Sequence, residues 1–111
     1  MFEKDVKGLS MLLDFYGELL SERKQSVLAL YYNEDFSLAE IADEIGISRQ
    51  GARDLIKKAE EELRRFEEKL GLVERFEEAK QRIANIRKIS EGRELPESLT
   101  KEIEALAELF K

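Results

Sequence analysis

Residues 37–63 read SLAEIADEIGISRQGARDLIKKAEEEL, and this stretch decides the fold. Ser37 and Glu40 make the S-x-x-E pattern of a capping box, in which each side chain bonds the other residue's backbone N–H at the start of a helix. Gly46 follows that helix, where a left-handed backbone conformation costs little only for glycine. Ser48 can cap a second helix. The stretch therefore predicts two helices joined by a tight turn, a helix-turn-helix.

The rest of the chain is predicted to be helical as well, because its apolar residues recur at spacings of three and four rather than two. The expected helices span residues 3–20, 22–32, 38–45 and 49–70, then a segment after Gly71 up to a break at Gly92, and a last segment from Pro96. The predicted fold class is all-α. It consists of a helix-turn-helix in a winged-helix-like three-helix core without a wing, with an extra N-terminal helix and C-terminal helices.

The chain is expected to divide into a helical head, residues 1–65 with the helix-turn-helix at 37–63, and a C-terminal amphipathic helical extension, residues 66–111. One apolar stripe continues along the extension, and such a stripe packs on the head or on a second copy of the chain. The predicted packing or oligomer contacts are Leu63, Phe66, Leu70, Phe76, Ile83, Ile86, Leu99, Ile103, Leu106 and Phe110.

Composition narrows the classes of function. The chain has 111 residues with no Cys and no His, so disulfides, thiol chemistry and the commonest metal ligand are absent. No phosphate-binding glycine loop, nucleophile elbow or metal-ligand spacing occurs, so we expect neither an enzyme nor a cofactor or metal. No apolar run reaches the roughly 20 residues of a membrane span, and no signal-peptide pattern is found, which predicts a cytoplasmic protein.

Charge is distributed unevenly along the chain. The net charge is −6, with 4 basic and 10 acidic residues in 1–48, 6 basic and 4 acidic in 49–65, and 9 basic and 11 acidic in 66–111. The second helix of the motif is therefore the only positive segment. A polyanion would be repelled by the chain as a whole and attracted by this one helix.

The outward side of this second helix is the candidate binding face. Its residues are Arg49, Gln50, Arg53, Asp54, Lys57 and Lys58. Arg can pair with guanine, Gln with adenine, and Lys with phosphate, so the face suits nucleic acid. The alternative is a solvated face of an ordinary helical hairpin. Asp54 favours that alternative, because a carboxylate repels phosphate unless it accepts a hydrogen bond from a cytosine amino group.

Two neighbouring features of the same helix are open to more than one interpretation. Gly51 could allow close approach of a partner, or the helix could simply tolerate it. The acidic residues that follow the two lysines, Glu60, Glu61 and Glu62, are expected to make exposed intrahelical pairs with Lys57 and Lys58. Each such pair contributes only about 0.2–0.5 kcal/mol.

Several segments together carry a resemblance to known proteins: Asp14-Phe15-Tyr16-Gly17, Leu30-Tyr31-Tyr32, Ser48-Arg49-Gln50 and Ile56-Lys57-Lys58. In the order of its elements the chain resembles region 4 of bacterial sigma factors. It is similar above all to the YlxM-like helix-turn-helix family of small cytosolic bacterial proteins. Asp54 matches that family's pattern, whereas Ala52 and Arg53 stand where a branched apolar and an aromatic residue are expected.

The resemblance implies a fold similar to the DNA-binding part of sigma factors and a regulatory role. It also implies a link to the signal recognition particle pathway, because genes of the family lie beside that of the particle's GTPase. Four functions therefore remain open: binding of DNA or signal-recognition RNA, a protein adaptor that docks on the particle's protein, a homodimer or larger homo-oligomer built through the C-terminal stripe, and a sigma-like transcription regulator.

Overall fold

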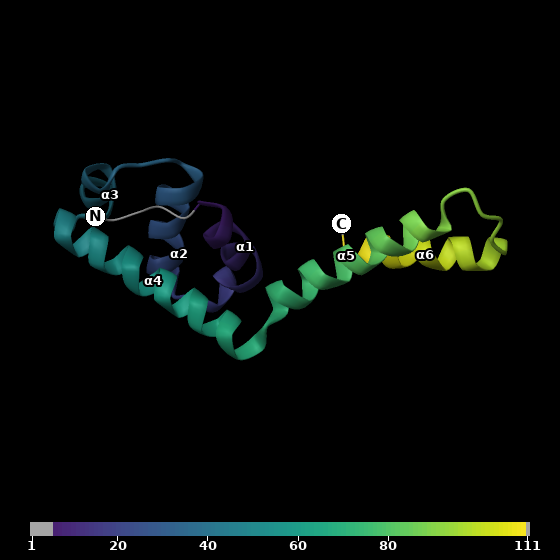
Figure 1. Ribbon diagram of the computed structural model, residues 1–111. Coiled ribbons are helices and arrows are strands. Elements are labelled where there is room, and N and C mark those ends of the chain that lie inside the picture. The colour runs from purple at the N-terminus through teal and green to yellow at the C-terminus, as the bar shows by residue number, and fades with distance from the viewer. Residues whose placement is uncertain (1–5, 111) are drawn as a thin grey trace. The chain divides into compact units, whose positions relative to one another are not determined.

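The computed structural model describes residues 6–110 of the chain, with side chains from residue 8 onward. Its elements, shown in Figure 1, are α1 (Val6–Tyr16), the 3₁₀ turn η1 (Gly17–Leu19), α2 (Glu22–Leu28), the π-helical turn η2 (Ala29–Asn33), α3 (Leu38–Ile45), α4 (Arg49–Leu70), α5 (Leu72–Ser90) and α6 (Glu97–Leu109). Residues 6–110 contain no strand. The predicted all-α fold with a helix-turn-helix is confirmed.

The chain divides into two compact units, one ending at Gly71 and the other beginning at Leu72. This boundary lies later than the expected one after residue 65, because α4 continues without a break to Leu70. Gly71 then ends α4 in a left-handed conformation with φ 63°, and its N–H donates to the Glu67 carbonyl at 2.8 Å. The unit that ends at Gly71 takes the name head, in place of the expected residues 1–65, and the α5–α6 unit is called the hairpin.

The head is built on α4, against which α1, α2 and α3 all pack (Figure 1). The buried side of α4 carries Ala52, Ile56, Ala59 and Leu63, each with 0% of its surface exposed. Their spacing of four, three and four places them on one side of the helix. Burial of a large aliphatic side chain stabilises a fold by about 1.5–3 kcal/mol, so this side anchors α4 and leaves its opposite side outward.

Hydrogen bonds at the helix ends define the helix-turn-helix. Ser37 Oγ accepts from the Glu40 N–H at 3.1 Å, and Glu40 Oε1 accepts from the Ser37 N–H at 3.0 Å, so both halves of the capping box are present. The bond from the Ser37 N–H to the carboxylate, followed by the interaction with the Ser37 side chain, lowers the pKa of Glu40. Gly46 ends α3 with φ 82°, and Ser48 Oγ accepts from the Gly51 N–H at 2.9 Å.

Gly51 has a local structural explanation. A Cβ atom at this position would lie 3.1 Å from Ser48 Oγ, the atom that caps α4, and 3.7 Å from the Ile47 side chain. A larger residue would therefore crowd the cap. This role at the start of the helix is one that neither interpretation of Gly51 from the sequence included.

The N-terminal half differs from the sequence prediction in two places. α1 ends at Tyr16 rather than residue 20, because the chain turns through η1 and Leu20 adopts an extended conformation before Ser21 caps α2. As a result Leu19 is 59% exposed. The expected start of the helix at residues 3–5 lies outside the described residues. The second helix changes to a π-helical turn at Ala29, which periodicity could not indicate.

Three carboxylates of α4 face inward and bind the rest of the head. Glu60 is 6% exposed and accepts from the Tyr32 hydroxyl, Glu62 Oε2 lies 2.7 Å from Lys24 Nζ, and Glu67 Oε1 accepts from the Tyr16 hydroxyl at 2.5 Å. The expectation that Glu60 and Glu62 pair along the helix with Lys57 and Lys58 was therefore wrong. The reason is that both residues lie on the flanks of α4 that contact α2 and η2.

The contact between Tyr32 and Glu60 makes the stability of the head depend on pH. Burial, followed by the hydrogen bond to the Glu60 carboxylate, raises the pKa of Tyr32 above its usual 10.0. A raised pKa stabilises the folded state below pH 10, and this contribution is lost as the pH rises above 10. We expect Tyr32→Phe to lower the free energy of unfolding by about 1–3 kcal/mol at neutral pH, because a buried carboxylate loses its donor.

Urea unfolding of both proteins at several pH values checks this prediction. The difference between wild type and Tyr32→Phe should stay constant from about pH 7 to about pH 9 and shrink above about pH 10. Parallel curves across the whole range would show that the hydroxyl of Tyr32 does not hold Glu60.

The hairpin has a smaller core than the head. The Phe76 and Phe110 rings lie 5.7 Å apart between centroids, and Ile83 is buried. The predicted apolar stripe is divided between the two units: Leu63 and Phe66 lie in the head, where Phe66 contacts the Tyr16 ring. Ile103 is half-buried. The exposed members of the stripe are Leu70, Ile86, Leu99 and Leu106.

Candidate nucleic-acid interface

The outward side of the first half of α4 carries the predicted binding residues in two parallel rows. Residues four apart on a helix are neighbours. One row therefore holds Arg49, Arg53 and Lys57, which we call the basic row. The second holds Gln50, Asp54 and Lys58, which we call the polar row. All are exposed except Arg53, which is partly buried.

The polar row contains an internal hydrogen bond. Gln50 Nε2 donates to Asp54 Oδ1 at 2.9 Å, which occupies one face of the carboxylate and orients the Gln50 amide. Asp54 is therefore hydrogen-bonded within α4, one turn after Gln50, and is not an isolated carboxylate on the candidate binding face. The basic row holds no carboxylate between its cations, so of the two rows it is the one suited to an anionic ligand.

The charges of the two helices of the motif are opposite. Residues 49–58 carry four basic and one acidic side chains, whereas residues 38–45 of α3 carry three acidic and no basic side chains. The first turn of α4 contains no acidic residue, so its basic side chains add to the positive end of the helix dipole. A polyanion would therefore be directed to α4 and repelled by α3.

Comparison with known proteins identifies a family whose description names the same motif. The model of a family described as "Putative helix-turn-helix protein, YlxM / p13 like" matches residues 3–105. The UPF0122 protein YlxM of Bacillus subtilis (strain 168) is 42% identical over 101 residues, which cover 91% of this chain and 92% of that protein. The chain belongs to the YlxM / p13-like helix-turn-helix family.

Two further members of the YlxM / p13-like family are similar to the chain. The UPF0122 protein of Desulforamulus reducens is 41% identical over 101 residues, with 88% of this chain and 86% of that protein covered. The UPF0122 protein of Acetivibrio thermocellus is 52% identical over 79 residues, with 71% and 68% covered. The match to the family extends through α5 into α6, so the hairpin belongs to the family's common chain as well.

One residue of the candidate interface was missed in the sequence analysis. Arg64 lies two helical turns beyond Lys57, which places it on the same side of α4 as the basic row. Its Nη1 atom lies 3.9 Å from Glu60 Oε2, and half of its side chain is exposed. The spacing of seven from Lys57 was the signal that could have identified it.

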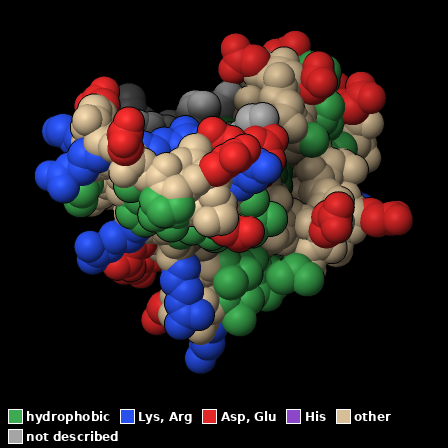
Figure 2. Space-filling view, turned by 90° about the vertical axis from the view of Figure 1, so that its right-hand side faces the viewer, with side chains coloured by type: hydrophobic (Ala, Val, Ile, Leu, Met, Phe, Trp, Pro, Cys, Tyr) green, Lys and Arg blue, Asp and Glu red, His purple; other side chains and the backbone are tan. Residues whose placement is uncertain are grey.

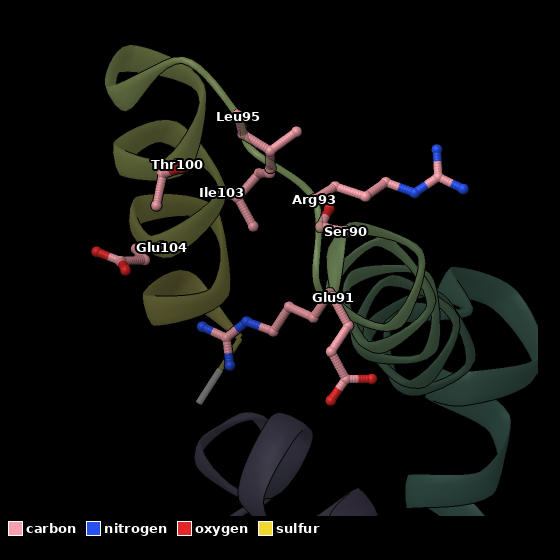
Figure 3. Close-up of a pocket in the computed structure, with 8 residues that line it drawn as sticks. Ser90, Glu91, Arg93, Leu95, Thr100, Ile103 and Glu104 are labelled. Atoms are coloured by element: carbon pink, nitrogen blue, oxygen red, sulfur yellow. The ribbon is translucent and has the colours of Figure 1, made fainter.

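A second candidate site is a hollow in the hairpin, and both of its hydroxyl groups are hydrogen-bonded to helix backbone. A hollow of about 360 Å³ lies where α5 and α6 meet their connecting loop, with Leu95 and Ile103 directed toward it and Arg93 extended away from α6 (Figure 3). Its two hydroxyls are engaged with the helix backbone, since Ser90 Oγ donates to the Ile86 carbonyl at 2.7 Å and Thr100 Oγ1 to that of Pro96 at 3.4 Å.

The face shown in Figure 2 carries charges of both signs with hydrophobic side chains among them, so it presents no single-sign field. Among the helices of residues 6–110, none combines the length with the low charge that crossing a bilayer requires.

Proposed function

We propose that the chain is a regulatory protein that binds nucleic acid through the basic row of α4. The observation that supports this most directly is the arrangement of Arg49, Arg53 and Lys57 at successive turns of a helix whose neighbouring side is buried in the head. Such a helix is held rigidly, and its cations are spaced to contact phosphates along one strand. An α-helix also fits the major groove of B-form DNA.

The polar row supplies the means to distinguish bases. When the Gln50 amide leaves Asp54 it can bond adenine, and the freed carboxylate can accept from a cytosine amino group. The basic row would provide most of the affinity and the polar row a smaller sequence preference. Strong preference for one duplex sequence would point to a sigma-like transcription regulator.

We propose further that the chain acts in the signal recognition particle pathway, with the particle's RNA as a second candidate ligand. This rests on the family resemblance, together with the basic row, which suits any phosphate backbone. The major groove of A-form RNA is too deep and narrow for a helix, so contact with RNA would involve phosphates and unpaired bases.

Binding of three ligands at two salt concentrations tests this proposal. The ligands are a generic DNA duplex, signal-recognition RNA and the particle's protein, followed by fluorescence anisotropy. Three phosphate contacts predict a slope of log affinity against log salt of about −2.7, which is roughly a 40-fold loss between about 50 and about 200 mM salt. If neither nucleic acid binds at the lower salt, the proposal fails. Binding to the protein alone would then support the adaptor function.

A further inference from the structure

The head has two neighbouring hollows whose described lining includes no residue of α4. One hollow, of about 440 Å³, lies between α1, η1 and α2, and another, of about 550 Å³, lies between α2, η2 and α3. Ser26 and Ala29 line both hollows, so the two adjoin along this side of α2, and we call them together the acidic groove. The described residues that line it include none from α4.

One side of α2 packs on α4, and the groove lies along its other side. Val27 and Leu28 are fully buried, and Lys24 bonds Glu62 of α4, so this side of α2 faces α4. Ser26 and Ala29 lie on the other side. Because both side chains are small, the backbone at the centre of the groove is open to close approach by another chain.

The floor of the groove carries apolar side chains from four segments of the head. Leu13 comes from α1, Leu30 from η2, Phe36 from the segment before α3, and Ile45 from the end of α3. All four side chains are only partly buried, so each keeps apolar surface exposed to water. Apolar surface of this kind, distributed along a groove, is typical of sites that receive the apolar face of a helix.

The rim of the groove is acidic. Asp14 and Glu18 border one hollow, and Glu34 and Glu44 border the other, and all four are exposed. The residues described as lining the groove include no Lys or Arg. The rim therefore repels nucleic acid and anionic lipid surfaces and attracts cations.

A π-helical turn lies in the middle of the groove. The Glu34 N–H donates to the Ala29 carbonyl at 3.0 Å, the i to i+5 pattern of this rare turn. Ala29, Leu30 and Asn33 of η2 all line the groove. Turns of this type occur frequently at functional sites. The position of the turn is an indication, independent of charge, that the groove is used.

We propose that the acidic groove binds a basic amphipathic helix of a partner protein. Apolar residues at i, i+3, i+4 and i+7 of such a helix would enter the floor, while its Lys and Arg residues would meet the rim. A second copy of the chain is less suitable, because its one positive segment is part of α4 and has its apolar side buried. The groove and the basic row could then be occupied together.

Anisotropy with a labelled helical peptide tests the proposal on the full chain. The probe contains only leucine and lysine, has a period of 3.6, and is about 18 residues long, enough to fold when bound. We expect Glu34→Lys with Glu44→Lys to weaken binding at least tenfold. Ala29→Gln, which fills the centre of the groove without changing its charge, should weaken binding at least fivefold.

Two controls separate the groove from net charge and from α4. Glu77→Lys with Glu102→Lys makes the same charge change on the hairpin and should stay within twofold of wild type. Reversal of Arg49 and Lys57 should not reduce peptide binding, so failure of the proposed nucleic-acid function is separable from failure here.

Several results would overturn the proposal. They are an absence of peptide binding to the full chain, equal binding by all variants, and equal binding of a peptide of the same composition arranged with period two. If circular dichroism shows that Glu34→Lys with Glu44→Lys is unfolded, Asp14→Lys with Glu18→Lys takes its place, with the same tenfold loss expected.

Discussion

Replacing Leu63 with alanine is expected to lower the free energy of unfolding of the head by about 2–5 kcal/mol. The side chain is 0% exposed and lies on the buried side of α4, so its loss leaves a cavity in the core of the head. Because this is a large fraction of the stability of a typical domain, the variant should unfold at markedly lower urea concentrations. Circular dichroism in increasing urea measures the change.

The matched control is Leu70→Ala, near the end of the same helix. Leu70 is 47% exposed, and we expect a change within about 0.5 kcal/mol. Sedimentation distinguishes a core role from an oligomer contact. Leu63→Ala should leave the mass of the folded protein unchanged, and a shift to a smaller species with little loss of stability would instead place Leu63 in an interface between copies.

Reversing the charges of Arg49 and Lys57 together is expected to weaken nucleic-acid binding by a factor on the order of 100 to 1,000. Each reversal changes the local charge by two, and a unit charge about 4 Å from a phosphate contributes about 1 kcal/mol in water-like surroundings. The two changes therefore amount to about 4 kcal/mol. Both residues are exposed, and Glu at position 49 suits the positive end of the helix dipole, so α4 should remain folded.

The expected signature of this double variant is a flatter salt dependence. Losing two phosphate contacts should reduce the slope by about 1.8 in magnitude, and the loss should be similar for all duplex sequences. The control is Arg75→Glu with Lys88→Glu, which makes the same charge change at exposed positions of α5. Equal weakening by both double variants would mean that net charge, and not the basic row, governs binding.

The parts of the fold that could be predicted are those encoded within a few residues. The capping pattern at Ser37 and Glu40 and the glycine at position 46 define the helix-turn-helix, and all their bonding partners lie within four positions. The candidate face followed from helical spacing alone. The bond between Gln50 and Asp54 is equally local, and a glutamine four residues before the aspartate was the available signal.

The parts that could not be predicted depend on residues distant in sequence. Glu60 follows two lysines, a local context typical of exposed intrahelical pairs, yet it is buried because Tyr32, 28 positions earlier, donates to it. Lys24 and Glu62 are 38 positions apart. The π-helical turn at Ala29 and the groove around it require three helices to be placed together first, so no single segment of the sequence reveals them.

The inward carboxylates of α4 determine which of its side chains face solvent. Glu60, Glu62 and Glu67 are each held by a different partner from α1, α2 or η2. Rotating α4 about its axis, or shifting it by one turn, would break all three contacts at once and leave Glu60 buried without its donor. The three acids therefore fix the rotation and the axial position of α4, and with them the residues that point to solvent. The outward residues of α4 could therefore be replaced in this chain while the three contacts keep the new side chains in the same orientation.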